Sequence, residues 1–202
     1  MKVSHVLYKV HNLEEGVSAF QEKGFHVEYG SKSHPHNALI YFPSGPYIEL
    51  LSAAPVPKYA QVLLRLIGKG KVADRFKRWA SVEEGFFGLC LENYEQDFKS
   101  EEKILNNYAQ KYFITDSGRI DPMDRVLKWK LLFPYALKLP FLMTYFNIDP
   151  KPKVVKHPNG IKQITRVSFG TDESLIPVVQ ALCDDEILNI HLGFGVSEVF
   201  YS

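Results

Sequence analysis

The chain has 202 residues, 46% hydrophobic and 23% charged, with a formal net charge of +1. This length and composition are typical of a soluble globular protein with a sizeable core. The near-neutral charge gives no reason to expect binding to nucleic acid or to a membrane surface. Cys90 and Cys183 lie in apolar stretches without metal-ligand spacing, which indicates buried free thiols and fits a reducing cytoplasm. The most apolar stretch, residues 131–146, is broken by prolines and is shorter than the ~20 residues of a membrane span.

The first fifty residues have the pattern of one βαβββ unit. Alternating apolar positions predict a strand over residues 2–10, and apolar residues at helical spacing predict a helix between Asn12 and Gly24. Asn12 is a plausible N-cap, and Gly24 would end the helix. Further strands are expected at residues 25–29, 38–42 and 47–51, after a polar loop at 31–36 and around a tight turn at 43–46.

A basic segment follows this first unit. From Lys58 to about Trp79, apolar side chains recur at helical spacing, while lysine and arginine occupy many of the other positions. Gly68 and Gly70 are expected to divide the segment into two pieces. We interpret it as an amphipathic helix that covers a sheet or an interface. A basic rim that attracts anionic ligands is the alternative.

The pattern of the first unit begins again at Gly85. We expect strands at 86–91, 111–115, 126–133 and 139–146, a helix from about 93 to 110, and a turn at 116–118. After a linker, a shorter strand–helix–strand passage resembles a reduced copy of the unit. The prediction is an α+β fold of tandem βαβββ modules that form a curved mixed sheet around a cup, with a partial third module. The expected parts of this one domain are module 1–54, connector 55–84, module 85–147, and linker with reduced module 148–202.

Short motifs throughout the chain resemble one known family. They are His5–Val10 with Asn12–Glu14, Phe20, Gly24-Phe25, His36–Ala38, Tyr47–Leu50, Gly118–Asp121, Leu127–Trp129, Leu139–Phe141 and His157–Gly160. In this order and spacing they resemble the glyoxalase-like domain family of the vicinal-oxygen-chelate superfamily. That superfamily includes glyoxalase I, extradiol dioxygenases and bleomycin-resistance proteins. Its members carry out isomerisations, ring openings, thiol transfers or sequestration, so the resemblance is more specific for fold than for reaction.

The resemblance implies that the first and last strands of each module supply metal ligands. In the first module these positions are His5 and Glu49, whereas in the second they fall near Phe86 and Thr144, which are poor ligands. His36 could complete a set of two histidines and a carboxylate that suits Zn²⁺, Fe²⁺, Mn²⁺ or Ni²⁺. In the alternative, the pocket is metal-free and Glu49 orients the imidazole of His5 or acts as a base.

Four more side chains are candidates for binding substrate. Arg119 would bind a carboxylate or phosphate, unless it pairs with Asp121 to stabilise its loop. Trp129 is expected to line the cup or the core. Tyr47 lies on the same strand face as the candidate carboxylate, and Asn37 follows the candidate histidine of the loop.

We therefore predict a cytoplasmic protein with a small-molecule ligand. The first hypothesis is an enzyme, a lyase, isomerase or dioxygenase of the glyoxalase-like type, in which His5 and Glu49 act on a carbonyl or dihydroxy compound. The second is a protein that sequesters a small molecule without turnover, which the incomplete ligand set favours. A third is an assembly role for the basic helix. The chain is expected to be a monomer or a homodimer.

Overall fold

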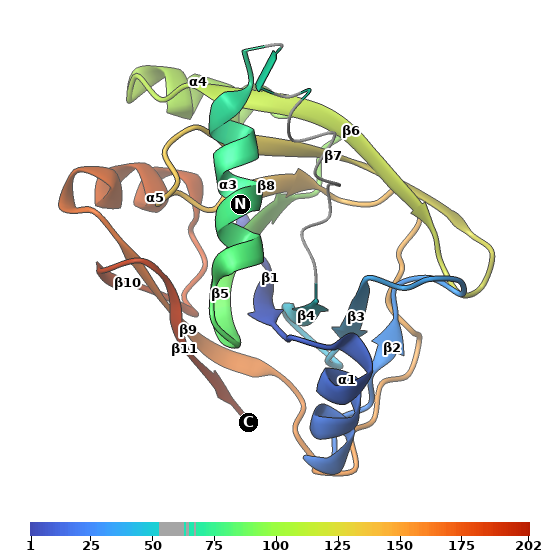
Figure 1. The fold of residues 1–202 in the computed structure, drawn as a ribbon. Helices are drawn as coiled ribbons and strands as arrows, with labels where there is room; N and C mark the ends of the chain where they lie inside the picture. The colour runs from blue at the N-terminus through green and yellow to red at the C-terminus, as the bar shows by residue number, and fades with distance from the viewer. Residues whose placement is uncertain (53–62, 64, 67) are drawn as a thin grey trace.

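The computed structural model describes residues 1–52, 63, 65, 66 and 68–202, which form two β-sheets with helices packed on them (Figure 1). The larger sheet has eight strands in the order β2-β3-β4-β1-β5-β8-β7-β6. At its centre β1 and β5 are antiparallel, while β4 lies parallel to β1 and β8 parallel to β5. The sheet is thus built from two βαβββ modules, as predicted. Its strands are β1 (Lys2–Lys9), β2 (Glu28–Tyr29), β3 (Asn37–Ile40), β4 (Tyr47–Leu51), β5 (Gly85–Asn93), β6 (Tyr112–Ile120), β7 (Val126–Pro134) and β8 (Phe141–Thr144).

The helix of the first module forms where the sequence predicts it. α1 (Leu13–Glu22) begins after Asn12, whose side-chain oxygen accepts hydrogen bonds from the amides of Glu14 and Glu15. The helix buries Leu13, Val17 and Phe20 in the core on the sheet face opposite the cup. The corresponding helix of the second module, α4 (Lys99–Asn107), is shorter than the predicted range.

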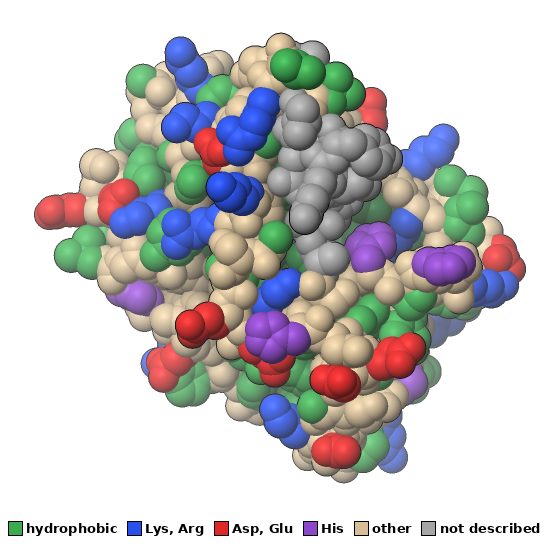
Figure 2. Space-filling view, in the orientation of Figure 1, with side chains coloured by type: hydrophobic (Ala, Val, Ile, Leu, Met, Phe, Trp, Pro, Cys, Tyr) green, Lys and Arg blue, Asp and Glu red, His purple; other side chains and the backbone are tan. Residues whose placement is uncertain are grey.

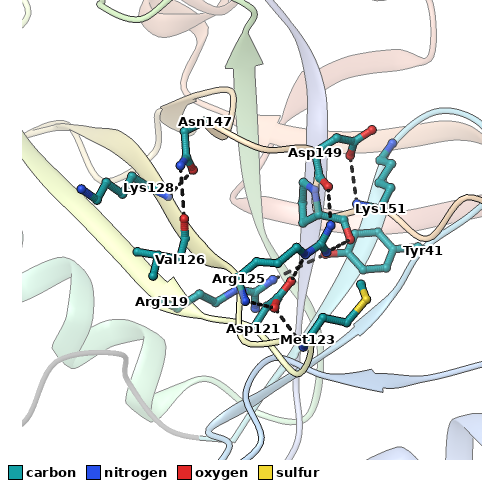
Figure 3. Close-up of polar contacts among 11 residues, drawn as sticks. Tyr41, Arg119, Asp121, Met123, Arg125, Val126, Lys128, Asn147, Asp149 and Lys151 are labelled. Carbon is teal, nitrogen blue, oxygen red and sulfur yellow. Dashed lines mark hydrogen bonds and ion pairs between the residues drawn. The ribbon is translucent and has the colours of Figure 1, made fainter.

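The predicted turn at residues 116–118 is wrong. These residues continue β6 and pair with residues 128–130 of β7. The chain turns instead at Asp121, whose carboxylate accepts hydrogen bonds from the amides of Met123 and Arg125 and from Arg125 Nε (Figure 3). Asp-Ser-Gly favours a turn locally, but pairing with β7 outweighs that preference.

The C-terminal part is a smaller unit with its own sheet. Its three strands have the order β10-β9-β11, and a short 3₁₀ helix (Glu173–Leu175) and α5 (Ile176–Leu182) connect two of them. Side chains of this unit share a continuous core with the large sheet, and this core includes Val167 and Phe169 as well as Val6 and Leu89. The strands are β9 (Ile164–Thr171), β10 (Leu188–Leu192) and β11 (Gly195–Tyr201).

One helix covers the cup face of the large sheet. α3 (Gly70–Ser81) buries Phe76 and Trp79 against Phe133 and Phe141 of the sheet. Its other face is exposed and basic, and Figure 2 shows lysine and arginine side chains around this part of the surface. The predicted amphipathic helix is thus present over residues 70–81, while most of its earlier part lies outside the described residues. None of the described helices is long and apolar enough to cross a membrane. The module boundaries stay a prediction.

Candidate functional site

The cup face of the sheet brings His5 and Glu49 together. In the parallel pair of β1 and β4, His5 lies opposite Tyr47 and Leu7 lies opposite Glu49. His5 and Glu49 are therefore diagonal neighbours on one face. His5 Nε2 lies 3.4 Å from Glu49 Oε2, and the imidazole stacks on the ring of Tyr47 with centroids 4.6 Å apart. The structure thus places a buried imidazole beside a partly exposed carboxylate.

Asn37 fixes the orientation of this carboxylate. Its amide Nδ2 donates to Glu49 Oε1 at 2.7 Å, which leaves Oε2 turned toward His5. Gly30 makes this arrangement sterically feasible, because a Cβ atom there would lie 2.1 Å from Asn37 Oδ1 and 2.7 Å from Arg119 Nη1. The absence of a side chain at Gly30 allows both polar groups to approach the site.

The pair lies in the wall of a cavity of about 550 Å³, a size suited to a small molecule. Much of the wall is aromatic. Motifs of polar residues do not identify these side chains, which only strand alternation and helix periodicity could have predicted. They include Phe76, Trp79, Phe113, Phe133, Phe141 and Phe146. All the side chains predicted to form the site line this cavity: His5, His36, Asn37, Tyr47, Glu49, Arg119 and Trp129.

Burial controls the charge of the imidazole. Desolvation lowers the pKa of His5 to about 4, Glu49 opposes this shift, and Arg119 adds to it. His5 is therefore neutral near pH 7 and has a lone pair on one ring nitrogen. Burial also raises the pKa of the Tyr47 hydroxyl well above its ordinary value, so this group remains protonated.

Arg119 lies at the rim of the cavity, on strand β6 and not in the predicted loop (Figure 3). The alternative that Arg119 pairs with Asp121 is wrong, because Asp121 is paired with Arg125 at 2.7 Å. Arg119 Nη2 lies 3.5 Å from the hydroxyl of Tyr41, and its buried Nε has no hydrogen-bond partner among the described residues. A wider groove of about 1360 Å³ shares Arg119 with the cup, so this guanidinium lies where the two spaces meet.

The model of the glyoxalase-like domain family matches residues 3–182. The chain belongs to this family. A crystal structure of a hypothetical protein from Staphylococcus aureus is 18% identical, with a TM-score of 0.68 over 99% of this chain and 90% of that one. This likeness concerns the fold alone.

Two further structures come from the vicinal-oxygen-chelate superfamily. A methylmalonyl-CoA epimerase from Streptomyces coelicolor, in complex with 2-nitronate-propionyl-CoA, is 13% identical, with a TM-score of 0.42 over 71% of this chain and 96% of that one. A glyoxalase I mutant from Zea mays is 16% identical, with a TM-score of 0.42 over 89% of this chain and 54% of that one. At these TM-scores neither carries an argument about the site. No curated protein matches significantly.

In this glyoxalase-like protein, the two positions of the second module that correspond to His5 and Glu49 do not line the cup. Phe86 packs edge-on against Tyr8 in the core on the opposite face, because irregularities in the pairing of β1 and β5 shift the register. Thr144 accepts a hydrogen bond from the amide of Lys130. The side chains that β8 contributes to the cavity are Phe141 and Met143, which are apolar. Neither of these two positions, on β5 and β8, therefore supplies a metal ligand to the cup.

The family resemblance implies a divalent metal, but the described residues do not complete a site for one. No three His, Cys, Asp or Glu side chains in this part of the chain are grouped to hold a metal. His36 lines the cavity but is exposed, and does not join the pair in such a group. Because Asn37 engages one oxygen of Glu49, the pair offers one nitrogen and one oxygen, which is too few ligands for a stable protein site.

Protonation of His5 should make stability depend on pH. The pKa of His5 is about 4 in the folded protein against an ordinary value of 6.5, so the unfolded chain binds more protons between these values. Stability should therefore fall as pH decreases through this window, by about 3 kcal/mol in total from this group. Urea unfolding of wild type and His5→Gln is measured from pH 7 to pH 4. The contribution of His5 is the difference between the two proteins in the slope of unfolding free energy against pH.

The control for this measurement is His26→Gln. His26 also faces a carboxylate at 3.4 Å, that of Glu28, but its side chain is 58% exposed. It should retain the wild-type pH dependence. Equal slopes in wild type and His5→Gln would contradict a strongly depressed pKa for His5.

Proposed function

We propose that the protein is an enzyme that moves a proton on a small oxygenated compound, a carbonyl or dihydroxy molecule, bound in the cup. The observation that carries this proposal is the 3.4 Å contact between His5 Nε2 and Glu49 Oε2 in the wall of a cavity of about 550 Å³. A neutral imidazole beside a carboxylate is a suitable proton acceptor. Family membership agrees with the proposal, but the substrate and the reaction are inferred from the site.

The residues around the pair have complementary roles in this proposal. His5 and Glu49 accept and hold the proton, and Asn37 keeps the carboxylate in place. Arg119 binds an anionic group of the ligand or the oxygen on which negative charge develops. The aromatic wall excludes water, which strengthens each of these polar interactions.

Exchange with heavy water tests the proposal. The protein is incubated in D₂O with separate panels of 2-oxoacids, hydroxyketones and catechols, and NMR follows deuterium incorporation and product formation. Enzyme-dependent exchange or conversion of at least one compound supports proton transfer. If no panel member is converted, the proposed reaction is contradicted for these ligand classes.

Binding without turnover is the second candidate. The cup wall is mainly apolar and the described residues provide an incomplete set of metal ligands, so the cavity could retain a ligand without altering it. In an NMR titration with the panel compounds, saturable shifts in the signals of residues that line the cavity, with no exchange or conversion over days, would support this alternative. The absence of both binding and conversion would contradict both candidates.

Metal content is a separate prediction. A divalent ion (Zn²⁺, Fe²⁺, Mn²⁺ or Ni²⁺) bound by His5 and Glu49 would need oxygens from a ligand or water to complete its coordination. We therefore expect protein purified without chelators to hold far less than one ion per chain, as measured by inductively coupled plasma mass spectrometry. Stoichiometric metal in wild type that is lost in His5→Ala would contradict this interpretation.

Arg119 should determine the preference for anionic ligands. Arg119→Gln is expected to weaken binding of a carboxylate ligand by about 10-fold to 100-fold, because a charge-assisted hydrogen bond is lost. A neutral ligand of similar shape should lose much less affinity. Calorimetric titration of both ligands measures the difference. Arg125→Gln is the control, since Arg125 is held by Asp121 and by the carbonyls of residues 149 and 150.

A further inference from the structure

A second set of buried polar side chains contacts His5 on the ring nitrogen opposite Glu49. An irregularity in the pairing of β1 and β5 lies between Val3 and His5, so Ser4 has no direct partner on β5. Ser4 Oγ lies 3.0 Å from His5 Nδ1 and donates to Glu92 Oε2 at 2.7 Å. Ser4, His5 and Glu92 are only 2%, 4% and 7% exposed. The serine thus contacts the imidazole, and the carboxylate contacts the serine, away from bulk water.

The direction of these hydrogen bonds determines where the imidazole carries its proton. The Ser4 hydroxyl has a single hydrogen, and the Glu92 carboxylate takes it, so an oxygen lone pair faces His5 Nδ1. Nδ1 must then be the protonated nitrogen of the neutral ring. Met143 Sδ, at 3.4 Å from Ser4 Oγ, is too weak an acceptor to compete with a carboxylate.

The other tautomer would inactivate the site. If the Ser4 hydrogen pointed to Nδ1, the ring proton would sit on Nε2 and donate to Glu49 Oε2. His5 would then offer no lone pair to the cup. In the tautomer that Ser4 favours, Nε2 and Glu49 Oε2 are both acceptors, 3.4 Å apart. A ligand group that lies against both acceptors must be a proton donor, such as a hydroxyl or an acidic C–H.

We propose that Glu92, through the Ser4 hydroxyl, is a positioning residue that holds His5 in the Nδ1–H tautomer and keeps Nε2 as the proton acceptor of the cup. This inference rests on the proposed function of His5. Glu92 itself does not line the cavity. It acts by fixing the hydrogen-bond direction one residue away from the reacting group.

Nitrogen NMR of histidine labelled with ¹⁵N in the ring tests the tautomer directly. Loss of a signal in His5→Gln assigns the resonances of His5. Burial raises the pKa of Glu92, so spectra are recorded at about pH 8, far above the ordinary pKa of a carboxyl group. Wild type should show a protonated Nδ1 and a bare Nε2. Ser4→Ala should shift the equilibrium to a protonated Nε2, and Glu92→Gln should shift it in the same direction.

Glu101→Gln is the matched control, because Glu101 is another buried glutamate and accepts a hydrogen bond from Asn93 at 3.0 Å. It should leave the His5 signals unchanged. A protonated Nε2 in wild type would overturn the proposal, even if Ser4→Ala failed to fold. An unchanged tautomer in both folded variants would also overturn it. The spectra need no ligand, so a failure here is distinct from a failure to find proton exchange.

Discussion

Replacing His5 with glutamine is expected to slow proton exchange on a bound substrate by about 10²-fold to 10⁴-fold. Glutamine nearly preserves the volume but cannot accept the proton. The wild-type rate should stay level from pH 8 to about pH 5, because burial lowers the pKa of His5 to about 4. Deuterium exchange measured by NMR at a series of pH values gives both results. A decline in rate centred near the ordinary pKa of 6.5 would contradict the lowered pKa of His5, and a wild-type rate in His5→Gln would contradict its role as the acceptor.

A double-mutant cycle separates a working pair from two independent residues. If His5 and Glu49 act together, Glu49→Gln should also lose most of the activity, and the double variant should lose little more than either single one. Additive losses would contradict joint action. His26→Gln, at an exposed histidine with a similar carboxylate distance, should retain the wild-type rate.

The sequence could predict much of this site because its chemistry lies on strands. A parallel pairing of the first and fourth strands places side chains of one face in register, so His5 and Glu49 were predictable neighbours. Asn37 was predictable as a site residue, but not its bond to Glu49, which depends on the pairing of β3 and β4 and on the missing side chain at Gly30. Such contacts depend on register, which motifs alone do not determine.

The features that differ from the predictions also have physical causes. The family resemblance places Phe86 at the second-module position that corresponds to His5, but each irregularity in a strand pair changes the face on which later side chains lie. The same effect concealed the contact of Ser4 with His5. The turn preference of residues 116–118 predicts a loop at Arg119, but strand pairing with β7 outweighs that preference.

Arg75 should have a large effect on stability although it is outside the site. It is buried in α3 and donates hydrogen bonds to the carbonyl oxygens of Leu139, Pro134 and Ala136. Burial lowers its pKa to about 10, a cost of roughly 3 kcal/mol relative to the ordinary value of 12.5. Three hydrogen bonds from a charged donor contribute about 1.5–3 kcal/mol each, so they outweigh that cost. Arg75→Met is expected to lower the free energy of urea unfolding by about 3 kcal/mol.

Lys77→Met is the control, because Lys77 is exposed on the same helix and should change stability by less than about 0.5 kcal/mol. Arg75→Lys keeps the charge but cannot reach three carbonyls in the same geometry, so it should be destabilised at least as much as Arg75→Met. The carbonyls belong to the end of β7 and to the segment between β7 and β8, and Phe76 and Trp79 of α3 line the cup. Weaker anchoring of α3 should therefore also reduce ligand affinity. Wild-type stability in Arg75→Met would show that these hydrogen bonds merely offset the cost of burying the charge.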